Sequence, residues 1–220
     1  MHWDAVLFDL DGTLLDTAAD MAAAANHVLQ HYGYSPLNAA QIQANTSQGV
    51  HGLLHAGFAG ALPDDMTVLR ARFLAYYHAN VCRDTRLYPG VTALLQQIAQ
   101  SGCPWGIVTN KPTALTQALL PYFPALAQPA VLVCADTLAQ RKPHPAPMHH
   151  ACAQLGLSES RTLYLGDART DIQAAQAAGM PSAVAGWGYI SPDIDTRDWG
   201  ADGVFASVTE FMHWLATHRV

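Results

Sequence analysis

The feature that most constrains the fold is a short apolar run near the N-terminus that ends in two carboxylates. Residues Ala5–Phe8 are apolar throughout and are bounded by charge and glycine, a pattern typical of a strand buried on both faces of a parallel sheet. Asp9 and Asp11 follow, where the strand gives way to Gly12 and Thr13. Ligands of open α/β sheets bind beyond the carboxyl ends of strands, so the two carboxylates are candidates for a reactive pair in a crevice. A tight turn with Thr13 as a helix cap is the alternative interpretation.

A second predicted strand ends in residues suited to phosphate. Residues Trp105–Val108 repeat the apolar run, and Thr109 and Asn110 follow them, ahead of a helix that begins at Pro112. A hydroxyl and a carboxamide in front of a helix N-terminus can donate hydrogen bonds to phosphoryl oxygens without adding negative charge. Ordinary turn and cap residues would produce the same pair.

A later strand ends, like the first, in carboxylates. It is predicted at residues 161–165, and Asp167 and Asp171 follow it, with a helix expected from about Ala168. Helix capping explains only one of these two carboxylates comfortably. A hard divalent cation would explain the other, because Mg²⁺ binds one or two carboxylates together with waters and phosphate oxygens.

The chain contains only two lysines, Lys111 and Lys142, and each of them precedes a proline. Lys142 cannot lie inside a helix, because Pro143 and Pro145 follow it, so we expect a rigid loop to hold it. This favours a positioned cation over a solvated surface side chain. Lys111 lies in the same kind of Lys-Pro step, so the scarcity of lysine does not choose between the two.

A long segment without strand signals separates the first strand from the others. Helices are predicted in it at residues 16–31, 38–45, 47–58 and 64–81. We therefore expect an α/β fold with a Rossmann-like parallel sheet core, residues 1–15 and 87–220, and an inserted helical cap domain, residues 16–86. Within the cap, Ser47 to Gly52 are predicted to form a polar, glycine-bearing turn whose backbone amides could face a ligand, with a plain helix cap as the alternative.

Composition and charge restrict the partners of this chain. It has 220 residues, half of them hydrophobic, which is enough for a substantial core. The net charge is −6 and the 11 lysines and arginines form no basic stripe, so we expect a small-molecule partner and no nucleic acid. The sequence shows neither a leader pattern nor an apolar run of membrane-spanning length. These features predict a cytoplasmic protein with no membrane partner. They do not determine the oligomeric state, for which we expect a monomer or a homodimer.

The ordered set of strand-end motifs resembles a known superfamily. The set consists of Asp-x-Asp-Gly-Thr from Asp9, Thr-Asn at Thr109, Lys-Pro at Lys142 and Gly-Asp-x-x-x-Asp from Gly166. It resembles the haloacid dehalogenase-like hydrolases, and within them the phosphoglycolate phosphatase-like phosphatases, along essentially the whole chain. The resemblance implies a Rossmann-like sheet with a helical cap inserted after the first motif, in agreement with the insertion predicted above.

The resemblance also implies a role for each matching residue. Asp9 would be the nucleophile that forms an aspartyl-phosphate, and Asp11 the general acid and then the general base. Mg²⁺ would be held by Asp9, the backbone carbonyl of Asp11, Asp167 and, directly or through the outer shell, Asp171. The phosphoryl oxygens would be held by Thr109, Asn110 and Lys142.

The resemblance leaves more than one substrate open. Residues 187–192 and 198–202 are similar to the branch of N-acetylmuramic acid 6-phosphate phosphatases, so we expect hydrolysis of that ester or of 2-phosphoglycolate. A sugar phosphomutase of the β-phosphoglucomutase kind and a broad-specificity phosphatase are the alternatives. Ser47 and His51 are the substrate-binding candidates of the cap. His51 stands where those relatives tend to have arginine, so a pH-dependent group replaces a permanent cation.

Overall fold

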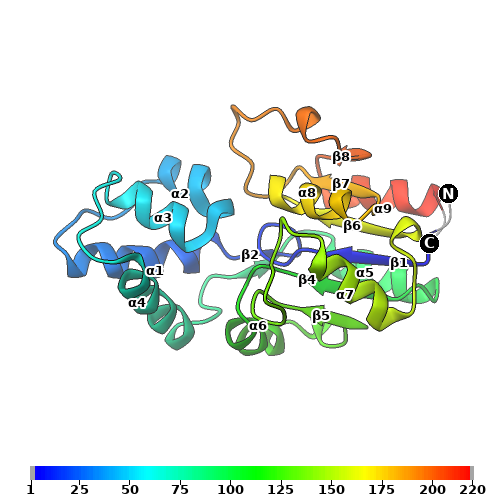
Figure 1. The fold of residues 1–220 in the computed structure, drawn as a ribbon, viewed down its shortest axis with the longest axis horizontal. Helices are drawn as coiled ribbons and strands as arrows, with labels where there is room; N and C mark the ends of the chain where they lie inside the picture. Colours follow the sequence, from blue (N-terminus) through cyan, green and yellow to red (C-terminus); the bar gives the residue numbers. More distant parts are fainter. Residues whose placement is uncertain (1–2, 219–220) are drawn as a thin grey trace.

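A parallel six-stranded sheet forms the core of the protein, in a computed structural model that describes residues 3–218 (Figure 1). The strand order is β5-β4-β1-β6-β7-β8, and every neighbouring pair is parallel. The strands are β1 Ala5–Phe8, β4 Trp105–Val108, β5 Val131–Val133, β6 Thr162–Gly166, β7 Ser182–Ala185 and β8 Gly203–Phe205. The predicted α/β class and parallel sheet are confirmed.

Helices cover both faces of this sheet. Along β1, Val6 and Phe8 point into one core and Leu7 into the other, because successive side chains of a strand alternate between faces. The first core is closed by α5 (Val91–Gln100) and α9 (Val208–Thr217). The second is closed by α7 (Ala146–Leu155) and α8 (Arg169–Ala177). Burial on both faces explains why β1 reads as a continuous apolar run rather than an alternating one.

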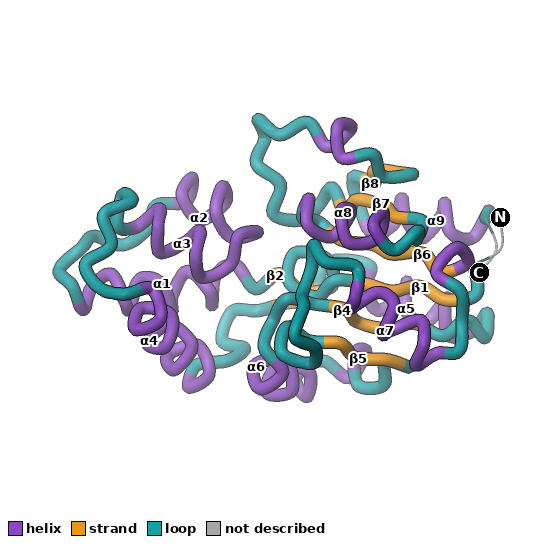
Figure 2. The backbone as a smooth tube through the Cα atoms, viewed as in Figure 1, coloured by secondary structure: helices purple, strands orange, loops and turns teal. Residues whose placement is uncertain are grey.

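Four helices form a separate lobe, which we call the cap (Figure 2). They are α1 Ala18–His31, α2 Ala39–Asn45, α3 Gly49–Gly57 and α4 Met66–Ala79. Leu29, Leu53 and Phe73 belong to a hydrophobic core that these helices share among themselves. One core residue, Leu115, comes from α6 (Thr113–Leu119), which follows β4 and so joins the cap to the sheet domain. Short 3-10 helices lie at Thr46–Gln48, Leu120–Tyr122, Pro124–Leu126, Glu159–Arg161 and Thr196–Trp199.

The two chain segments that connect the cap to the core lie side by side. Strand β2 (Leu15–Asp16) pairs with β3 (Arg86–Leu87) in an antiparallel ribbon that the sequence analysis did not predict. Asp20 reinforces this junction, because its buried carboxylate accepts hydrogen bonds from the backbone N–H groups of Asp84 and Thr85, at 3.0 Å each. No helix within residues 3–218 is long and apolar enough to cross a membrane.

Candidate active site

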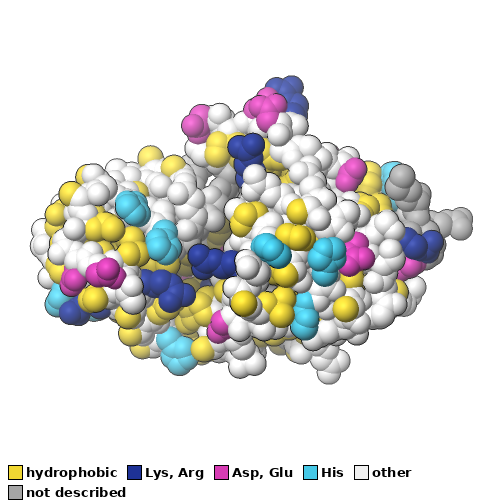
Figure 3. All heavy atoms as spheres, in the orientation of Figure 1, with side chains coloured by type: hydrophobic (Ala, Val, Ile, Leu, Met, Phe, Trp, Pro, Cys, Tyr) yellow, Lys and Arg dark blue, Asp and Glu magenta, His cyan; other side chains and the backbone are white. Residues whose placement is uncertain are grey.

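The carboxyl ends of β1, β4 and β6 meet at one edge of the sheet, facing the cap. A cavity of about 420 Å³ lies between this edge and the cap. Figure 3 shows lysine and arginine side chains at the boundary between the two lobes. The core contributes Asp9, Asp11, Thr109, Asn110, Lys111, Lys142 and Asp167 to the cavity wall, and the cap contributes Ser47, His51, Arg70 and Tyr77. All the predicted site residues except Asp171 therefore line one cavity, and Asp171 lies directly behind it.

Lys142 is the cation at the centre of this edge. Its Nζ lies 2.9 Å from Asp9 Oδ1 and 2.6 Å from Asp171 Oδ1, and it donates a 2.8 Å hydrogen bond to the carbonyl oxygen of Val108. The Tyr164 hydroxyl is 2.8 Å away and is wholly buried in β6. Burial alone would lower the pKa of Lys142, but the Asp171 and Asp9 carboxylates outweigh it and raise this pKa. Lys142 therefore stays charged.

Three buried carboxylates crowd around this one ammonium group. Oxygen atoms of Asp9, Asp167 and Asp171 all lie within 4.8 Å of one another. Burial, followed by the charges of Asp9 and Asp171, raises the pKa of Asp167 well above its ordinary value. The cluster is an all-oxygen donor set with more negative charge than Lys142 offsets, which suits a hard divalent cation such as Mg²⁺. The described residues therefore fit the metal that the sequence predicts.

The two later carboxylates differ in what already holds them. Asp167 Oδ2 accepts a 2.8 Å hydrogen bond from the backbone N–H of Tyr189, and Thr13 Oγ1 donates to Asp167 Oδ1 at 3.3 Å. Asp171 Oδ1 pairs with Lys142, and its Oδ2 accepts from the backbone N–H of Ala168, which caps α8. Asp171 is thus paired with the Lys142 ammonium group, whereas the partners of Asp167 are neutral, and this difference favours a role for Asp171 in orienting Lys142.

Two glycines make room for the Asp167 carboxylate. A Cβ on Gly12 would lie 2.1 Å from Asp167 Oδ2, and a Cβ on Gly188 would lie 2.3 Å from Asp167 Cβ. Gly12 also has φ +85°, a conformation that side-chain-bearing residues rarely adopt. The glycine of the Asp-Gly-Thr motif is therefore required both by its turn and by the carboxylate packed against it.

Lys111 is a site residue that the sequence analysis did not assign to the candidate site. Its buried Nζ donates to both Asp11 oxygens, at 3.1 and 3.0 Å, and to the hydroxyl of Tyr77 at 2.9 Å. Tyr77 belongs to α4 of the cap, so this lysine joins the predicted general acid to the cap. Burial raises the pKa of Tyr77 to about 12, so its hydroxyl stays protonated. The Lys-Pro step is the sequence feature that could have pointed to Lys111 as a site residue, but Lys142 has the same feature, so it does not tell the two roles apart.

The remaining predicted residues fall into two groups. Thr109 is buried at the end of β4, whereas the Asn110 side-chain amide donates a 3.0 Å hydrogen bond to the backbone carbonyl of Lys142 and so supports that loop. Ser47 and His51 are exposed side chains on the cap wall of the cavity. The cap residues therefore face the carboxyl edge of the sheet from across the cavity.

Comparison with known proteins agrees with this arrangement. The family model described as haloacid dehalogenase-like hydrolase matches residues 6–185. A phosphoglycolate phosphatase of Xanthomonas campestris pv. campestris is 44% identical over 198 residues, which cover 90% of each chain. An N-acetylmuramic acid 6-phosphate phosphatase of Pseudomonas aeruginosa is 36% identical over 203 residues, 92% of this chain and 90% of its own.

A solved structure matches the fold closely. The crystal structure of a predicted phosphoglycolate phosphatase from Haemophilus somnus 129pt has a TM-score of 0.86 and 26% identity, and the match covers 97% of this chain and 98% of that one. Its similarity extends over both the sheet domain and the cap. The chain therefore belongs to the haloacid dehalogenase-like hydrolase family and is a phosphatase, as the order of its strand-end motifs predicts.

Proposed function

We propose that the protein is a Mg²⁺-dependent phosphomonoester hydrolase that acts on a small sugar or acid phosphate through an aspartyl-phosphate on Asp9. The observation that carries this proposal is the position of the Asp9 carboxylate, at the floor of the cavity and 2.9 Å from the Lys142 ammonium group. A carboxylate there can attack a phosphoryl group whose oxygens the same lysine binds. The names of the relatives support N-acetylmuramic acid 6-phosphate and 2-phosphoglycolate as substrates.

In the first step, an Asp9 oxygen attacks phosphorus and the bond between phosphorus and the ester oxygen breaks. The departing alkoxide takes a proton from Asp11, which leaves a free alcohol and a phosphorylated Asp9. Lys142 donates to phosphoryl oxygens and keeps Asp9 in line, and Thr109 and Asn110 complete this binding edge. Lys111 holds the Asp11 carboxylate at the cavity wall through two hydrogen bonds.

In the second step, Asp11 accepts a proton from water, and the resulting hydroxide attacks the phosphorus of the aspartyl-phosphate. The phosphorus–oxygen bond to Asp9 breaks, so inorganic phosphate leaves and the Asp9 carboxylate is restored. Asp9, Asp167 and the backbone carbonyl of Asp11 would hold the metal, with Asp171 as a further carboxylate. Bound Mg²⁺ would withdraw charge from the phosphoryl oxygens and offset the repulsion between these carboxylates and the substrate dianion.

The test is phosphate release in Mg²⁺ and in EDTA, side by side on N-acetylmuramic acid 6-phosphate, 2-phosphoglycolate and several hexose phosphates. We expect turnover only with Mg²⁺, and no turnover in the Asp9→Asn variant. Asp193→Asn is the matched control, because Asp193 is an exposed aspartate of the loop after β7 and lies outside the cavity wall. It should retain wild-type activity.

Two results would contradict the proposal. Phosphate release by Asp9→Asn at the wild-type rate would exclude Asp9 as the nucleophile. Isomerisation of a sugar phosphate without net release of phosphate would show a mutase instead. The preference for one ester is read from kcat/KM, where a hundredfold difference corresponds to about 3 kcal/mol of differential transition-state binding.

A further inference from the structure

The cap wall of the cavity contains an arginine that forms no ion pair with an acidic side chain of the described residues. Arg70 of α4 lines the cavity and is half-buried. Within residues 3–218 it forms no ion pair and no hydrogen bond. Hydrogen bonds from Thr113 are the main cause of the lowered pKa of the exposed Asp136, and the charge of Arg70 contributes least to it. The two lysines of the same cavity behave differently, because Lys111 pairs with Asp11 and Lys142 with Asp9. Arg70 is therefore available to an anion that enters the cavity.

The position of Arg70 is set by the helix that carries it. Arg70, Phe73, Leu74 and Tyr77 all line the cavity, and their spacing of three, four and seven residues places them on one face of α4. Tyr77 fixes this face against the core through its hydrogen bond to Lys111, which in turn holds Asp11. Arg70 lies seven residues from Tyr77, or about 10 Å along the helix axis. The backbone of Arg70 is thus displaced by about two turns from the end of this face that contacts Lys111.

Another arginine of the cavity wall, Arg141, is a weaker candidate for binding such an anion. It immediately precedes Lys142 in the core loop and its side chain is exposed, so its charge acts beside the phosphoryl-binding lysine. Arg70 approaches from the cap, across the cavity from that loop. Ser47 and His51 line the cap wall as well, so Arg70 stands among groups that can donate hydrogen bonds to the part of the substrate remote from phosphorus.

We propose that Arg70 is a specificity-determining residue that binds a second anionic group of the substrate, a carboxylate, while the phosphoryl group lies at Asp9 and Lys142. A planar guanidinium matches a carboxylate with two parallel hydrogen bonds, which gives both charge and direction. This inference rests on the proposed phosphatase function. It assigns the chemical class of substrate to esters that carry an acid group apart from the phosphate.

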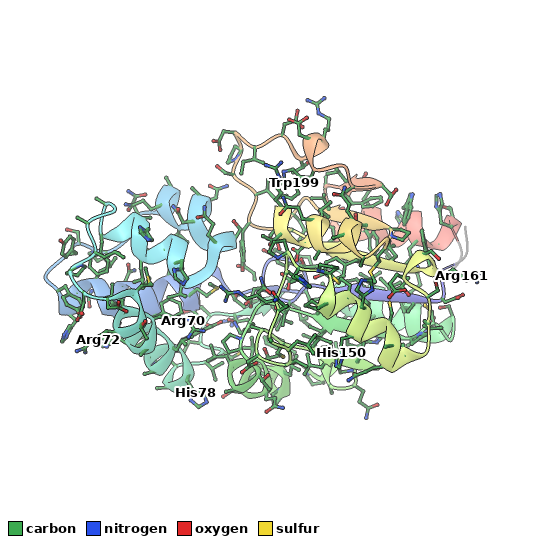
Figure 4. The ribbon with its side chains drawn as sticks, in the orientation of Figure 1. Arg70, Arg72, His78, His150, Arg161 and Trp199 are labelled. Carbon is green, nitrogen blue, oxygen red and sulfur yellow. The ribbon has the colours of Figure 1, made fainter. Side chains whose placement is uncertain are left out.

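The chain offers a matched control on the same helix. Arg72 is exposed, lines no part of the cavity and lies two residues further along α4. Figure 4 shows Arg70 on the side of α4 nearer the core and Arg72 on the side farther from it. Arg70→Gln and Arg72→Gln therefore remove the same charge from one helix, once inside the cavity and once outside it. Among the residues that the structure describes, neither arginine forms an ion pair with an acidic side chain, so we expect both variants to fold, with thermal unfolding as the check.

The test compares esters with and without the acid group. One pair is N-acetylmuramic acid 6-phosphate and N-acetylglucosamine 6-phosphate, which lacks the lactyl carboxylate. The other is 2-phosphoglycolate and 2-hydroxyethyl phosphate, in which a hydroxymethyl group replaces the carboxylate. For each pair the ratio of kcat/KM is measured in the wild type and in both variants. We expect Arg70→Gln to lower the ratio by about 10- to 100-fold in at least one pair, the range that charge-assisted hydrogen bonds supply, mainly through KM.

The outcomes separate this inference from the function on which it rests. A ratio that is unchanged in Arg70→Gln while wild-type turnover is intact overturns the inference alone, as does an equal loss in Arg72→Gln. If the ratio falls in the first pair alone, the substrate class is a sugar acid. If it falls in the second pair alone, the substrate class is a short acid. If glucose 1,6-bisphosphate loses as much kcat/KM as the acids do, the second anion is a phosphate and the carboxylate assignment is wrong. Absence of phosphate release from every ester in the wild type would overturn the proposed function itself.

Discussion

Replacing Lys142 with methionine removes the one cation that lies among three buried carboxylates. Its Nζ is 2.9 Å from Asp9 Oδ1 and 2.6 Å from Asp171 Oδ1. At an effective dielectric constant of about 20, each contact corresponds to roughly 6 kcal/mol of Coulomb attraction. Desolvation of the ammonium offsets much of this, and removal of one partner from a buried ion pair costs about 3–5 kcal/mol. We expect the lower end of that range, because one stranded carboxylate can take up a proton.

Two measurements report this loss. In EDTA, a cost of about 3 kcal/mol should lower Tm by about 6–12 °C for a chain of this size. In saturating Mg²⁺ the difference in Tm should shrink, because the metal supplies positive charge to the same carboxylates. The activity should fall about 1,000-fold in kcat, the upper range for loss of one preorganised donor at a developing charge. Arg169→Met is the matched control, since Arg169 is an exposed cation at the start of the neighbouring α8.

Either of two results would contradict these roles of Lys142. If Lys142→Met keeps kcat within about tenfold of the wild type in Mg²⁺, the lysine does not bind the phosphoryl group in the transition state. If Arg169→Met lowers Tm in EDTA as much as Lys142→Met does, the loss reflects overall charge and not the pairing with Asp9 and Asp171.

Two further predictions follow from the charges of the site. Burial beside Asp9 and Asp171 raises the pKa of Asp167, so the folded metal-free protein retains a proton that the unfolded chain releases. The free energy of unfolding of the metal-free protein should therefore fall as pH rises from about 4 toward the raised pKa of Asp167. In EDTA, thermal unfolding of Asp167→Asn should show a weaker pH dependence of stability than the wild type, and added Mg²⁺ should no longer stabilise this variant. An unchanged pH dependence would refute the prediction. Tyr77→Phe should lower the free energy of unfolding by about 1 kcal/mol and lower kcat about fivefold, with KM unchanged. Unaltered kinetics would show that the hydrogen bond between Lys111 and the Tyr77 hydroxyl does not help to position Asp11.

The architecture of the core could be predicted because its strands end in residues with specific chemistry. The apolar run of β1 stops at Asp9 and that of β6 at Asp167, and both lie at the same sheet edge in the structure. Parallel strands bring their carboxyl ends together whatever the length of chain between them, so order in the sequence converts directly into proximity. The cluster of the Asp9, Asp167 and Asp171 carboxylates is a consequence of that rule.

Other parts of the site depend on contacts that no local pattern encodes. The Lys-Pro steps at Lys111 and Lys142 look alike, yet one lysine meets Asp11 and the other meets Asp9. Asn110 carries the chemistry of a phosphate ligand, but its amide donates to the Lys142 carbonyl. The ribbon of β2 and β3 has two residues in each strand, too few for any hydrophobic periodicity. Only the tertiary structure assigns these partners.

Helix α4 carries both Arg70, the proposed carboxylate ligand, and Tyr77, which contacts Lys111 beside Asp11. Tyr77 contacts Lys111 beside the predicted general acid, and Arg70 lies on the same helical face, about two turns away. A position of the cap that lets Tyr77 reach Lys111 therefore also fixes the distance between Arg70 and the phosphoryl-binding edge. An ester whose acid group does not meet Arg70 at that distance would hold the cap less firmly, and Asp11 would lose part of its support. Selectivity should accordingly appear in kcat as well as in KM for substrates of the wrong length.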